Sequence, residues 1–386
     1  MRITAVIAEY NPFHDGHRYH LAKARAMTGA DAVIVLMSGD FVQRGEPAVI
    51  DKYARTEAAL AAGADAVFMM PVQVSTGSAA VFAHGAVRIL DRMKAVSCLC
   101  CGTESEDSGS ILQAAELLQN EPGEFREELK KLLSSGMPYP AAVSSALDSV
   151  CPGTGSVLDL PNNTLAVEYD RALIRLVSDI KLCTVPRIGT DHNDNTLLPE
   201  SDVASASAIR KGILEGTDTA KYITPEMRQN LHYHISADDL SPVLNYVLLM
   251  SGKKDLLAVP EISEDMALRI LSHAGEYHSF REWISLIKTR NLTYARVSRA
   301  LLHLILGITG CEEPSAVRLL GFRKDSSEVL RVLQDSTEIP IVTKLAGSGL
   351  SDASPDIRAS RLYAMLVKEK AGVILKDEYL RSPIIV

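Results

Sequence analysis

The fold of this chain is decided by its opening stretch, which reads Ile3-Thr4-Ala5-Val6-Ile7-Ala8-Glu9-Tyr10-Asn11-Pro12-Phe13-His14-Asp15-Gly16-His17. Its apolar first part is typical of a strand that is buried on both faces of a parallel sheet. A loop with Asn11 and Pro12 follows, and the residues from Gly16 onward predict a helix. The stretch therefore predicts a strand, a loop and a helix in immediate succession.

The start of that helix is a candidate phosphate site. A helix N-terminus presents unpaired N–H groups and the positive end of the helix dipole. His14 and His17 are three residues apart, so their imidazoles fall on one face of the first turn. There they can donate to phosphate oxygens as negative charge develops during attack on an α-phosphate. The alternatives are two incidental polar residues in a loop, or a zinc site, which lacks a third ligand at a sensible spacing.

The sequence up to residue 101 alternates between strand-like and helical segments. Apolar runs occupy residues 3–8, 32–37, 66–70 and 95–101, and helical stretches at 17–27, 52–62 and 80–92 separate them. Asp51 is placed to cap the second helix. Gly29 and Gly63 each precede the sequence Ala-Asp-Ala-Val, where glycine can end a helix directly before the next strand. The pattern predicts an α/β fold in which a right-handed series of βαβ units forms a parallel sheet.

The remainder of the chain predicts a second domain. At 386 residues the chain is too long for one typical core. Residues 108–150 indicate a helical insertion within a first domain of residues 1–215. Loops and a short helix are expected between Arg187 and Arg210. A helical period dominates from about residue 224, so residues 216–386 are expected to form a mainly α-helical domain.

The composition narrows the class of protein. The chain is 47% hydrophobic and 23% charged, which is ordinary for a globular protein, and its net charge of −8 argues against a surface that grips nucleic acid everywhere. No apolar run reaches the length of a membrane span, and no signal peptide opens the chain, so a cytoplasmic protein is expected. Six cysteines lack the paired spacing of a zinc site, and buried free thiols are expected instead. We expect no metal held by protein side chains alone.

Several sequence blocks resemble one known family. The chain resembles the bacterial tRNA(Met) cytidine acetate ligases, within the superfamily of HIGH-type nucleotidyltransferases, which have a Rossmann-like, doubly wound α/β fold. The resemblance covers essentially the whole chain. The matching blocks are Ala8-Glu9-Tyr10-Asn11-Pro12-Phe13-His14-Asp15-Gly16-His17, Met37-Ser38-Gly39-Asp40-Phe41-Val42-Gln43-Arg44-Gly45-Glu46-Pro47, Leu160-Pro161-Asn162-Asn163-Thr164-Leu165 and Ala206-Ser207-Ala208-Ile209-Arg210. Gly102-Thr103-Glu104 stands where the family commonly has Gly-Ser-Glu, which keeps a hydroxyl group.

The resemblance implies an activity and its substrates. That family activates acetate with ATP as acetyl-adenylate and passes the acetyl group to N4 of the wobble cytidine of elongator tRNA(Met). It implies ATP as the cofactor, accompanied by Mg²⁺. The implied ATP-binding residues are Ile7, Ala8, Glu9, Tyr10, Asn11, Pro12, Phe13, His14, Asp15, Gly16, His17, Arg18, Tyr19, His20, Gly102, Asn162 and Arg187.

The positions of Gly102, Asn162 and Arg187 in the sequence are also compatible with ligand binding, apart from the resemblance. Gly102 ends the fourth buried strand, at the sheet edge where open α/β sheets bind ligands, although a plain turn glycine is an equal alternative. Asn162 follows Pro161 in a predicted turn and could contact adenine or ribose, or only form an Asx-turn. Arg187 follows an apolar run and could hold phosphate oxygens. Without the family resemblance, an ordinary solvated arginine would be the simpler interpretation.

Two further groups are candidates for phosphate chemistry. Asp40 ends the second buried strand and is a catalytic candidate beside His14 and His17, because it could organise a magnesium-bound phosphate or orient the acceptor. A turn-capping aspartate is the alternative. Ser205, Ser207 and Arg210 belong to a segment that resembles the Ile-Ser-Ser-Thr-x-x-Arg signature of nucleotidyltransferases. Hydroxyl and N–H groups at a helix start, with one arginine, suit the β and γ phosphates, although a serine-rich N-cap is the commoner explanation of such a segment.

A locally basic segment of the predicted helical domain is the candidate surface for tRNA. Its cations are Lys288, Arg290, Arg296 and Arg299, in a stretch without carboxylates. Arg296, Arg299 and His303 fall on one stripe of a helix that Thr293 can cap, and Tyr294 could stack on an unpaired base. The alternative is an ordinary solvated helix face.

Two other functions are compatible with the same predicted first domain. One is an adenylyl- or cytidylyltransferase that acts on a small molecule, and the other is a tRNA-binding protein with a vestigial ATP site. The sequence leaves open the oligomeric state, how the anticodon is recognised, how acetate is told from longer acids, and which group is the base for acetyl transfer.

Overall fold

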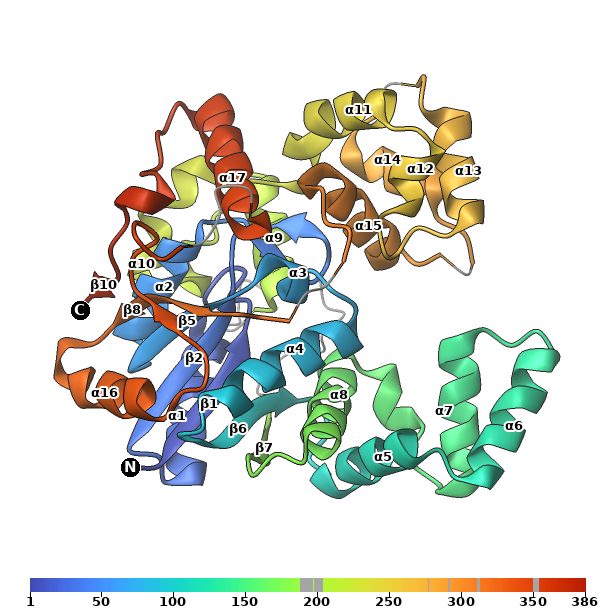
Figure 1. Ribbon diagram of the computed structural model, residues 1–386, viewed down its shortest axis with the longest axis horizontal. Helices are drawn as coiled ribbons and strands as arrows, with labels where there is room; N and C mark the ends of the chain where they lie inside the picture. The colour runs from blue at the N-terminus through green and yellow to red at the C-terminus, as the bar shows by residue number, and fades with distance from the viewer. Residues whose placement is uncertain (188–196, 198–203, 277, 291, 311–312, 350–353) are drawn as a thin grey trace.

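A mostly parallel sheet forms the centre of the protein. The computed structural model describes residues 1–187, 197, 204–276, 278–290, 292–310, 313–349 and 354–386 (Figure 1). The strands follow the order β10-β8-β5-β2-β1-β6-β7, with β9 beside β8. The parallel strands are β1 (Ile3–Ala8), β2 (Ala32–Ser38), β5 (Ala66–Met70), β6 (Val96–Thr103) and β7 (Lys181–Pro186). The chain runs outward from β1 to β5 and returns to the other side of β1 with β6, so the predicted doubly wound fold is confirmed.

Alternate residues of the central strands feed two separate cores. In β2, Val33, Val35 and Met37 belong to one core, whereas Ile34 and Leu36 belong to the other. Successive side chains of a strand point to opposite faces of a sheet, so a strand of uninterrupted apolar residues needs cover on both sides. Helices α1 (Asp15–Thr28) and α2 (Lys52–Ala61) contribute to the first core, and α4 (Ala79–Arg92) and α8 (Pro161–Leu176) contribute to the second.

The connections between these elements follow the sequence signals. Asp51 caps α2, because its carboxylate accepts hydrogen bonds from the backbone N–H groups of Tyr53 and Ala54 at 2.7 and 3.3 Å. Gly29 ends α1 in the left-handed conformation with φ 59°. Gly63 lies between α2 and β5 with φ 102°, which also favours glycine. A short hairpin of β3 (Phe41–Val42) and β4 (Glu46–Pro47) and the helix α3 (Val72–Ser75) complete this half of the chain.

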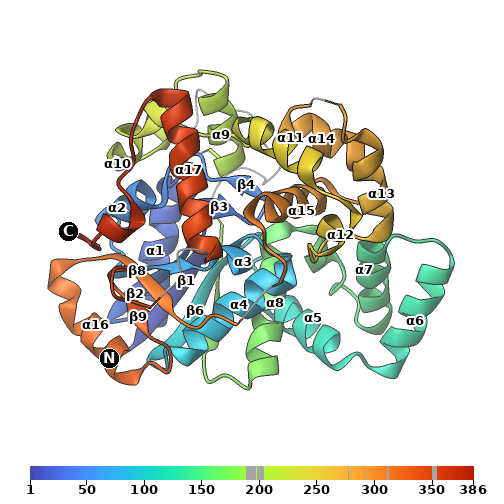
Figure 2. The same ribbon diagram turned by 45° about the horizontal axis from the view of Figure 1, so that its top comes forward.

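Two groups of helices extend beyond the sheet. Helices α5 (Ser108–Asn120), α6 (Gly123–Ser134) and α7 (Tyr139–Val150) form the helical segment that was expected at residues 108–150. Figures 1 and 2 show α6 and α7 at the end of the molecule opposite to the C-terminus. The second group contains α11 (Ser241–Met250), α12 (Lys253–Leu257), α13 (Glu264–His273), α14 (Phe280–Ile287) and α15 (Tyr294–Leu306).

The last part of the chain returns to the sheet. Strand β8 (Val317–Phe322) pairs antiparallel with β5, and β9 (Ile341–Val342) and β10 (Ile384–Ile385) pair parallel with β8. Helices α16 (Ser327–Ser336) and α17 (Pro355–Ala371) lie between these strands in the sequence. Helices make up most of the chain beyond residue 216, as expected, but these three strands belong to the edge of the N-terminal sheet. The division after residue 215 stays a prediction.

The shorter elements complete the description. They are α9 (Ala206–Leu214), α10 (Pro225–Arg228), and the 3₁₀ helices η1 (Ser156–Asp159), η2 (Ala220–Tyr222), η3 (Leu231–Tyr233), η4 (Ala237–Leu240), η5 (Lys324–Ser326) and η6 (Glu378–Leu380). The residues expected to be loops between 188 and 203 lie, except for Leu197, outside the described part of the chain. None of the helices in the described ranges is long and apolar enough to cross a membrane.

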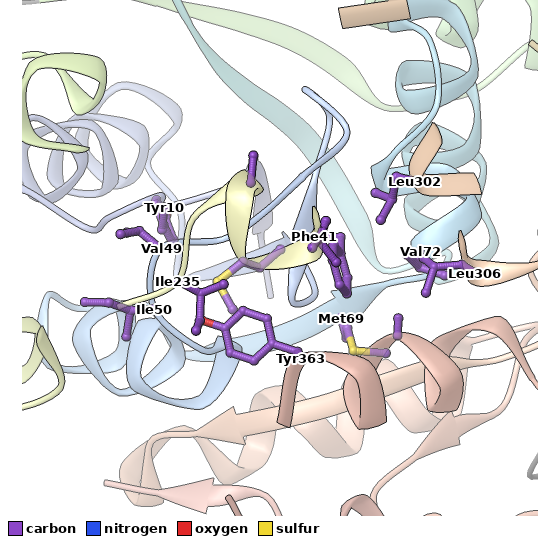
Figure 3. Packing of buried hydrophobic residues seen from close by; sticks show 14 of the residues in the cluster. Tyr10, Phe41, Val49, Ile50, Met69, Val72, Ile235, Leu302, Leu306 and Tyr363 are labelled. Atoms are coloured by element: carbon purple, nitrogen blue, oxygen red, sulfur yellow. The ribbon is translucent and has the colours of Figure 1, made fainter. Parts of the chain in front are cut away.

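The larger core joins distant parts of the sequence. Phe41 of the β3–β4 hairpin packs edge-on against Tyr363 of α17, with ring centroids 6.3 Å apart. Leu302 and Leu306 of α15 belong to the same cluster (Figure 3). The Tyr363 hydroxyl donates to the carbonyl of Ala48 at 2.9 Å. The hairpin is therefore fixed between the sheet, α15 and α17.

Candidate active site

A cavity of about 300 Å³ opens at the carboxyl ends of β1, β6 and β7. The order in which the chain adds strands to the sheet reverses at β1, since β2 and β5 lie on one side of it and β6 and β7 on the other. Open α/β sheets bind ligands at such a point. The starts of α1, α8 and α9 also border the cavity. The lining residues are Ile7, Ala8, Glu9, Tyr10, Asn11, His14, Gly16, His17, Tyr19, His20, Gln43, Arg44, Phe82, Cys101, Gly102, Pro161, Asn162, Leu165, Tyr169, Val185, Pro186, Arg187, Ala204, Ser205, Ala206, Ser207 and Arg210.

His14 and His17 are fixed at the start of α1 by a reciprocal cap. The Nδ1 atom of His14 accepts from the backbone N–H of Gly16 at 3.1 Å, and the Nδ1 atom of His17 accepts from the backbone N–H of His14 at 3.3 Å. Because both Nδ1 atoms are acceptors, each neutral ring carries its proton on Nε2. The two rings stack with centroids 3.8 Å apart. His14 Nε2 is buried and has no hydrogen-bond partner among the described residues.

The histidines of this site are held in the neutral form. Burial, helped by the charges of Arg187 and Arg210, lowers the pKa of His14 to about 3. Burial also lowers the pKa of His17 well below its usual value, and that of His20 to about 4. Near neutral pH the site therefore presents uncharged Nε2–H donors beside the positive end of α1.

The loop between β1 and α1 is held by hydrogen bonds to its backbone and to Asn11. Arg55 is buried and donates to the carbonyl groups of Glu9, at 2.6 Å, and Ser38, at 3.1 Å, which ties the ends of β1 and β2 together. The side chain of Asn11 accepts from the backbone N–H of Val49 at 2.8 Å. These contacts fix the position of the loop relative to β1 and β2.

Arg210 and the two serines predicted with it lie around one side of the cavity. Ser205 caps α9 through the backbone N–H of Ala208, at 3.0 Å. Arg210 donates to the carbonyl of Asn11 at 2.6 Å and to the hydroxyl of Ser207 at 3.0 Å. Burial lowers the pKa of Arg210 to about 10, so it stays charged near neutral pH. The guanidinium group thus joins α9 to the His14 loop and supplies positive charge.

Gly102, Asn162 and Arg187 also meet in the lining of the cavity. Gly102 pairs with Val185 across β6 and β7, and Arg187 follows the end of β7. Arg187 Nη1 approaches Asn162 Oδ1 at 3.4 Å, and its backbone N–H donates to the carbonyl of Thr103 at 2.9 Å. Three residues that are far apart in the sequence therefore converge because parallel strands end at one edge.

Four of the predicted ATP-binding residues do not line the cavity. They are Pro12, Phe13, Asp15 and Arg18. Phe13 is fully buried and packs against Tyr10 and His17. Asp15 and Arg18 are exposed and form a surface ion pair at 3.4 Å. The other predicted positions surround the cavity, although their contact with ATP stays a prediction.

Asp40 lies in a different environment from the one expected. Its carboxylate is buried and forms an ion pair with Lys52 Nζ, and it accepts from the backbone N–H of Lys52 at 3.1 Å. Lys52 Nζ also contacts Glu378 at 2.7 Å. Asp40 is absent from the lining of the cavity. This placement argues against a catalytic role, because the carboxylate already neutralises a buried ammonium group, and catalysis by Asp40 stays a prediction.

The hairpin tip contributes two cavity residues that the sequence prediction missed. The backbone N–H of Gln43 donates to Glu9 Oε1 at 2.8 Å, and Arg44 lines the cavity with an exposed side chain. Both residues stand in the block Gly39–Pro47 that carries the family resemblance. The signal was therefore present, but the local sequence does not reveal that this hairpin folds back over the end of β1.

Some of the predicted tRNA-binding residues are exposed, whereas others are occupied by contacts within the protein. Lys288 and Arg290 are exposed, and Arg296 is half-buried. Arg299 is bonded to both carboxylate oxygens of Glu261, at 2.8 and 2.9 Å. His303 is buried and contacts Thr76 Oγ1 at 2.8 Å, so it does not belong to a basic surface stripe. This corrects the predicted stripe, because the helix turns its second half into the core.

The thiols and the carboxylates do not suggest a metal centre. Cys98, Cys100, Cys101, Cys151 and Cys183 are free cysteines. Within the described ranges, no group of three histidine, cysteine, aspartate or glutamate residues could hold a metal ion. The expectation that no metal is held by protein side chains alone stays a prediction.

Known proteins resemble this chain along its full length. The family model of the HIGH nucleotidyl transferases matches residues 1–377. The tRNA(Met) cytidine acetate ligase of Clostridium perfringens (strain ATCC 13124) is 38% identical, and the comparison covers 100% of both chains. The ligase of the same name from Clostridium kluyveri is 33% identical and covers 100% of this chain and 99% of its own.

Two solved structures are also similar to this chain over its full length. The crystal structure of Thermotoga maritima TmcAL in its apo form has a TM-score of 0.91 at 27% identity, with 100% of both chains covered. The structure of the same protein bound with alpha-thio ATP has a TM-score of 0.89 at 27% identity, covering 100% of this chain and 99% of that one. The chain therefore belongs to the HIGH nucleotidyl transferase family and, within it, to the tRNA(Met) cytidine acetate ligases.

Proposed function

We propose that this protein is an ATP-dependent ligase that activates acetate as acetyl-adenylate and acetylates N4 of the wobble cytidine of elongator tRNA(Met). The observation that carries the proposal is the buried Nε2–H group of His14, which has no hydrogen-bond partner in the described part of the chain. A buried donor without a partner is costly, and a bound phosphate oxygen would satisfy it. The names of the full-length relatives supply the reaction.

In the first half-reaction, an acetate oxygen attacks the α-phosphorus of ATP and pyrophosphate leaves. The Nε2–H groups of His14 and His17 donate to the phosphate oxygens as their negative charge increases. Arg187 and Arg210 supply positive charge in the cavity lining, Ser207 contacts Arg210, and Ser205 caps the same helix. Gly102 and Asn162 border the part where the nucleoside would fit.

Magnesium accompanies the phosphates in this proposal. Glu9 is the one carboxylate residue of the described cavity lining, and one of its oxygens accepts from the backbone N–H of Gln43. Mg²⁺ commonly keeps several water ligands and binds through substrate phosphates with few protein ligands, which suits such a lining. Bound there, the ion would neutralise charge on the leaving pyrophosphate.

In the second half-reaction, the cytidine N4 amine attacks the acetyl carbonyl carbon and AMP leaves. An aromatic amine is a weak nucleophile, so positioning and exclusion of water carry this step. The exposed cations Lys288 and Arg290, with Arg296, are proposed to contact tRNA phosphates. Their place near α15 supports this, because Tyr294 donates to Glu46 on the cavity-bordering hairpin at 2.9 Å. An enzyme with these substrates would act in the cytoplasm.

Transfer of labelled acetate tests the proposal. The purified protein is incubated with ATP, Mg²⁺, ¹⁴C-acetate and unmodified elongator tRNA(Met), and the nucleosides are separated. Label in N4-acetylcytidine, dependent on ATP, is the expected result. Transfer of an adenylyl or cytidylyl group to a small molecule, without label in the tRNA, would favour a nucleotidylyltransferase instead. A tRNA with another base at the wobble position serves as the control.

A further inference from the structure

Helix α8 is capped by a residue from another part of the chain. Its own N-cap residue, Leu160, provides no side-chain hydrogen bond. Glu104, directly after β6, takes that place: its carboxylate accepts from the backbone N–H groups of Asn162 and Asn163 at 3.2 and 2.9 Å. A carboxylate at a helix N-terminus is stabilised by the unpaired N–H groups and by the helix dipole.

The contact is reciprocal. Asn163 is buried, and its Oδ1 atom accepts from the backbone N–H groups of Glu104 and Ser105 at 2.9 and 3.2 Å. The end of β6 and the start of α8 therefore hold each other through two sets of hydrogen bonds. Such paired contacts fix both the distance and the orientation of the two segments.

Glu104 also orients a side chain of the cavity. Its Oε1 atom accepts from Asn162 Nδ2 at 2.6 Å, which turns Asn162 Oδ1 toward Arg187 Nη1, 3.4 Å away. Burial lowers the pKa of Arg187, and the negative charge of Glu104 opposes this effect. Among the described residues Arg187 forms no ion pair with a carboxylate, and it lines the cavity. Glu104 itself does not line the cavity.

We propose that Glu104 is a positioning residue for ATP, which sets Asn162 and Arg187 in the geometry that binds the nucleotide. The inference rests on the proposed function, because Asn162 and Arg187 are ATP contacts only within that proposal. Glu104 acts through these two residues and touches no substrate atom. Its loss is expected to weaken nucleotide binding while leaving the chemistry of bound ATP nearly unchanged.

The direct test is the equilibrium Kd for ATP, measured by isothermal titration calorimetry on the full chain. Glu104→Gln keeps the shape of the side chain and removes its charge. We expect the Kd to rise about tenfold, as loss of a charged hydrogen-bonding partner commonly causes. Asp107→Asn is the matched control, because Asp107 caps α5 from an exposed position with a 2.9 Å bond to the N–H of Gly109. An unchanged Kd in Glu104→Gln, or an equal rise in Asp107→Asn, overturns the proposal.

A second variant separates positioning from a general loss of structure. Asn162→Ala removes the side chain that links Glu104 to Arg187 but keeps the backbone N–H groups. If Glu104 acts through Asn162, adding Glu104→Gln to Asn162→Ala raises the Kd less than twofold further. Multiplication of the two effects contradicts the proposal. Because ATP binding is measured without acetate or tRNA, the outcome does not depend on whether the acetylation reaction itself is confirmed.

Discussion

At the scale of single residues, the site depends on imidazoles that cannot easily take up a proton. A positive imidazolium would attract phosphate more strongly, but burial next to Arg187 and Arg210 opposes that charge. The neutral ring with Nδ1 as a helix-cap acceptor has one remaining function, which is to donate through Nε2. The cap thus determines the tautomer, and the tautomer determines what the residue can do.

Replacement of His14 by asparagine separates these two roles. Asparagine is a good N-cap residue, and its side-chain oxygen can accept from the N–H of Gly16 as Nδ1 does. It has no group in the place of Nε2–H. We expect kcat for ATP–pyrophosphate exchange to fall about 10²–10³-fold, as for other lost oxyanion donors, with a nearly unchanged melting temperature. His232→Asn, at an exposed position, should leave both unchanged; full activity in His14→Asn would remove His14 from the mechanism.

His303 allows a prediction about pH and stability away from the site. Burial lowers the pKa of His303 in the folded protein to about 4, whereas a histidine in the unfolded chain has its ordinary pKa of about 6.5. Between these values the unfolded chain binds the extra proton, so stability decreases as the pH falls below 6.5. We expect His303→Gln to reduce the loss of unfolding free energy between pH 7 and pH 5 by about 1–2 kcal/mol.

Urea unfolding at pH 7 and pH 5 measures this difference. For each protein, the free energy of unfolding at pH 5 is compared with its own value at pH 7. The comparison removes the constant cost of losing the contact with Thr76. An identical pH dependence in the wild type and in His303→Gln would show that His303 takes up its proton equally in both states. The buried histidines of the cavity contribute in the same direction, so the slope is reduced but not abolished.

At the scale of elements, the β3–β4 hairpin connects the cavity to α15. Gly45 has φ 77°, and a Cβ atom there would lie 2.3 Å from the backbone nitrogen of Arg299. Ser298 Oγ donates to the carbonyl of Gly45 at 3.0 Å. The hairpin can approach the helix this closely only because residue 45 has no side chain.

Gly45→Ala is therefore expected to be strongly destabilising. The variant combines a left-handed backbone with a backbone collision, and we expect a loss of about 3 kcal/mol or more in the free energy of unfolding. Gly216→Ala is the control, because Gly216 has φ 72° and open space around it. Its expected cost is about 1 kcal/mol, from backbone strain alone. Similar urea midpoints for the two variants would show that the hairpin does not need its close contact with α15.

The elements also show what the sequence could predict. Uninterrupted apolar strands, the Asp51 cap and the Gly29 turn are local signals, and they predicted β1, β2, β5 and β6 with the helices between them. The return of β8 to the sheet was missed, because the antiparallel partner of β5 lies more than 200 residues away and leaves no local trace. The position of Gln43 and Arg44 was missed for the same reason. The ion pair of Asp40 with Lys52 was not predicted, because only the fold buries these two side chains against each other.

At the scale of the whole molecule, a buried charge network joins the C-terminal segment to the N-terminal half. Lys52 contacts Asp40, Glu378 at 2.7 Å and Ser360 at 2.9 Å, and Arg318 of β8 contacts Glu378. Burial raises the pKa of Glu378, but the charges of Lys52 and Arg318 outweigh this and lower it to about 2. The network holds α2, β8 and the segment after α17 together in the interior.

Removal of one charge from this network should destabilise the entire chain. Lys52→Met leaves two buried carboxylates without their shared ammonium group, and we expect a loss of about 3–5 kcal/mol in the free energy of unfolding. Lys253→Met breaks the exposed pair with Glu264, 3.2 Å long, and should cost at most about 1 kcal/mol. Equal effects in thermal unfolding would show that the network does not support the packing of the C-terminal segment.

The most direct measurement for the whole enzyme is ATP–pyrophosphate exchange with and without acetate. The purified protein is mixed with ATP, Mg²⁺ and ³²P-labelled pyrophosphate, and the label that enters ATP is followed. If the cavity forms acetyl-adenylate reversibly, exchange requires acetate and is lost in His14→Asn. Exchange at the same rate in the absence of acetate would mean that another group accepts the adenylyl unit, and acetate activation would have to be abandoned.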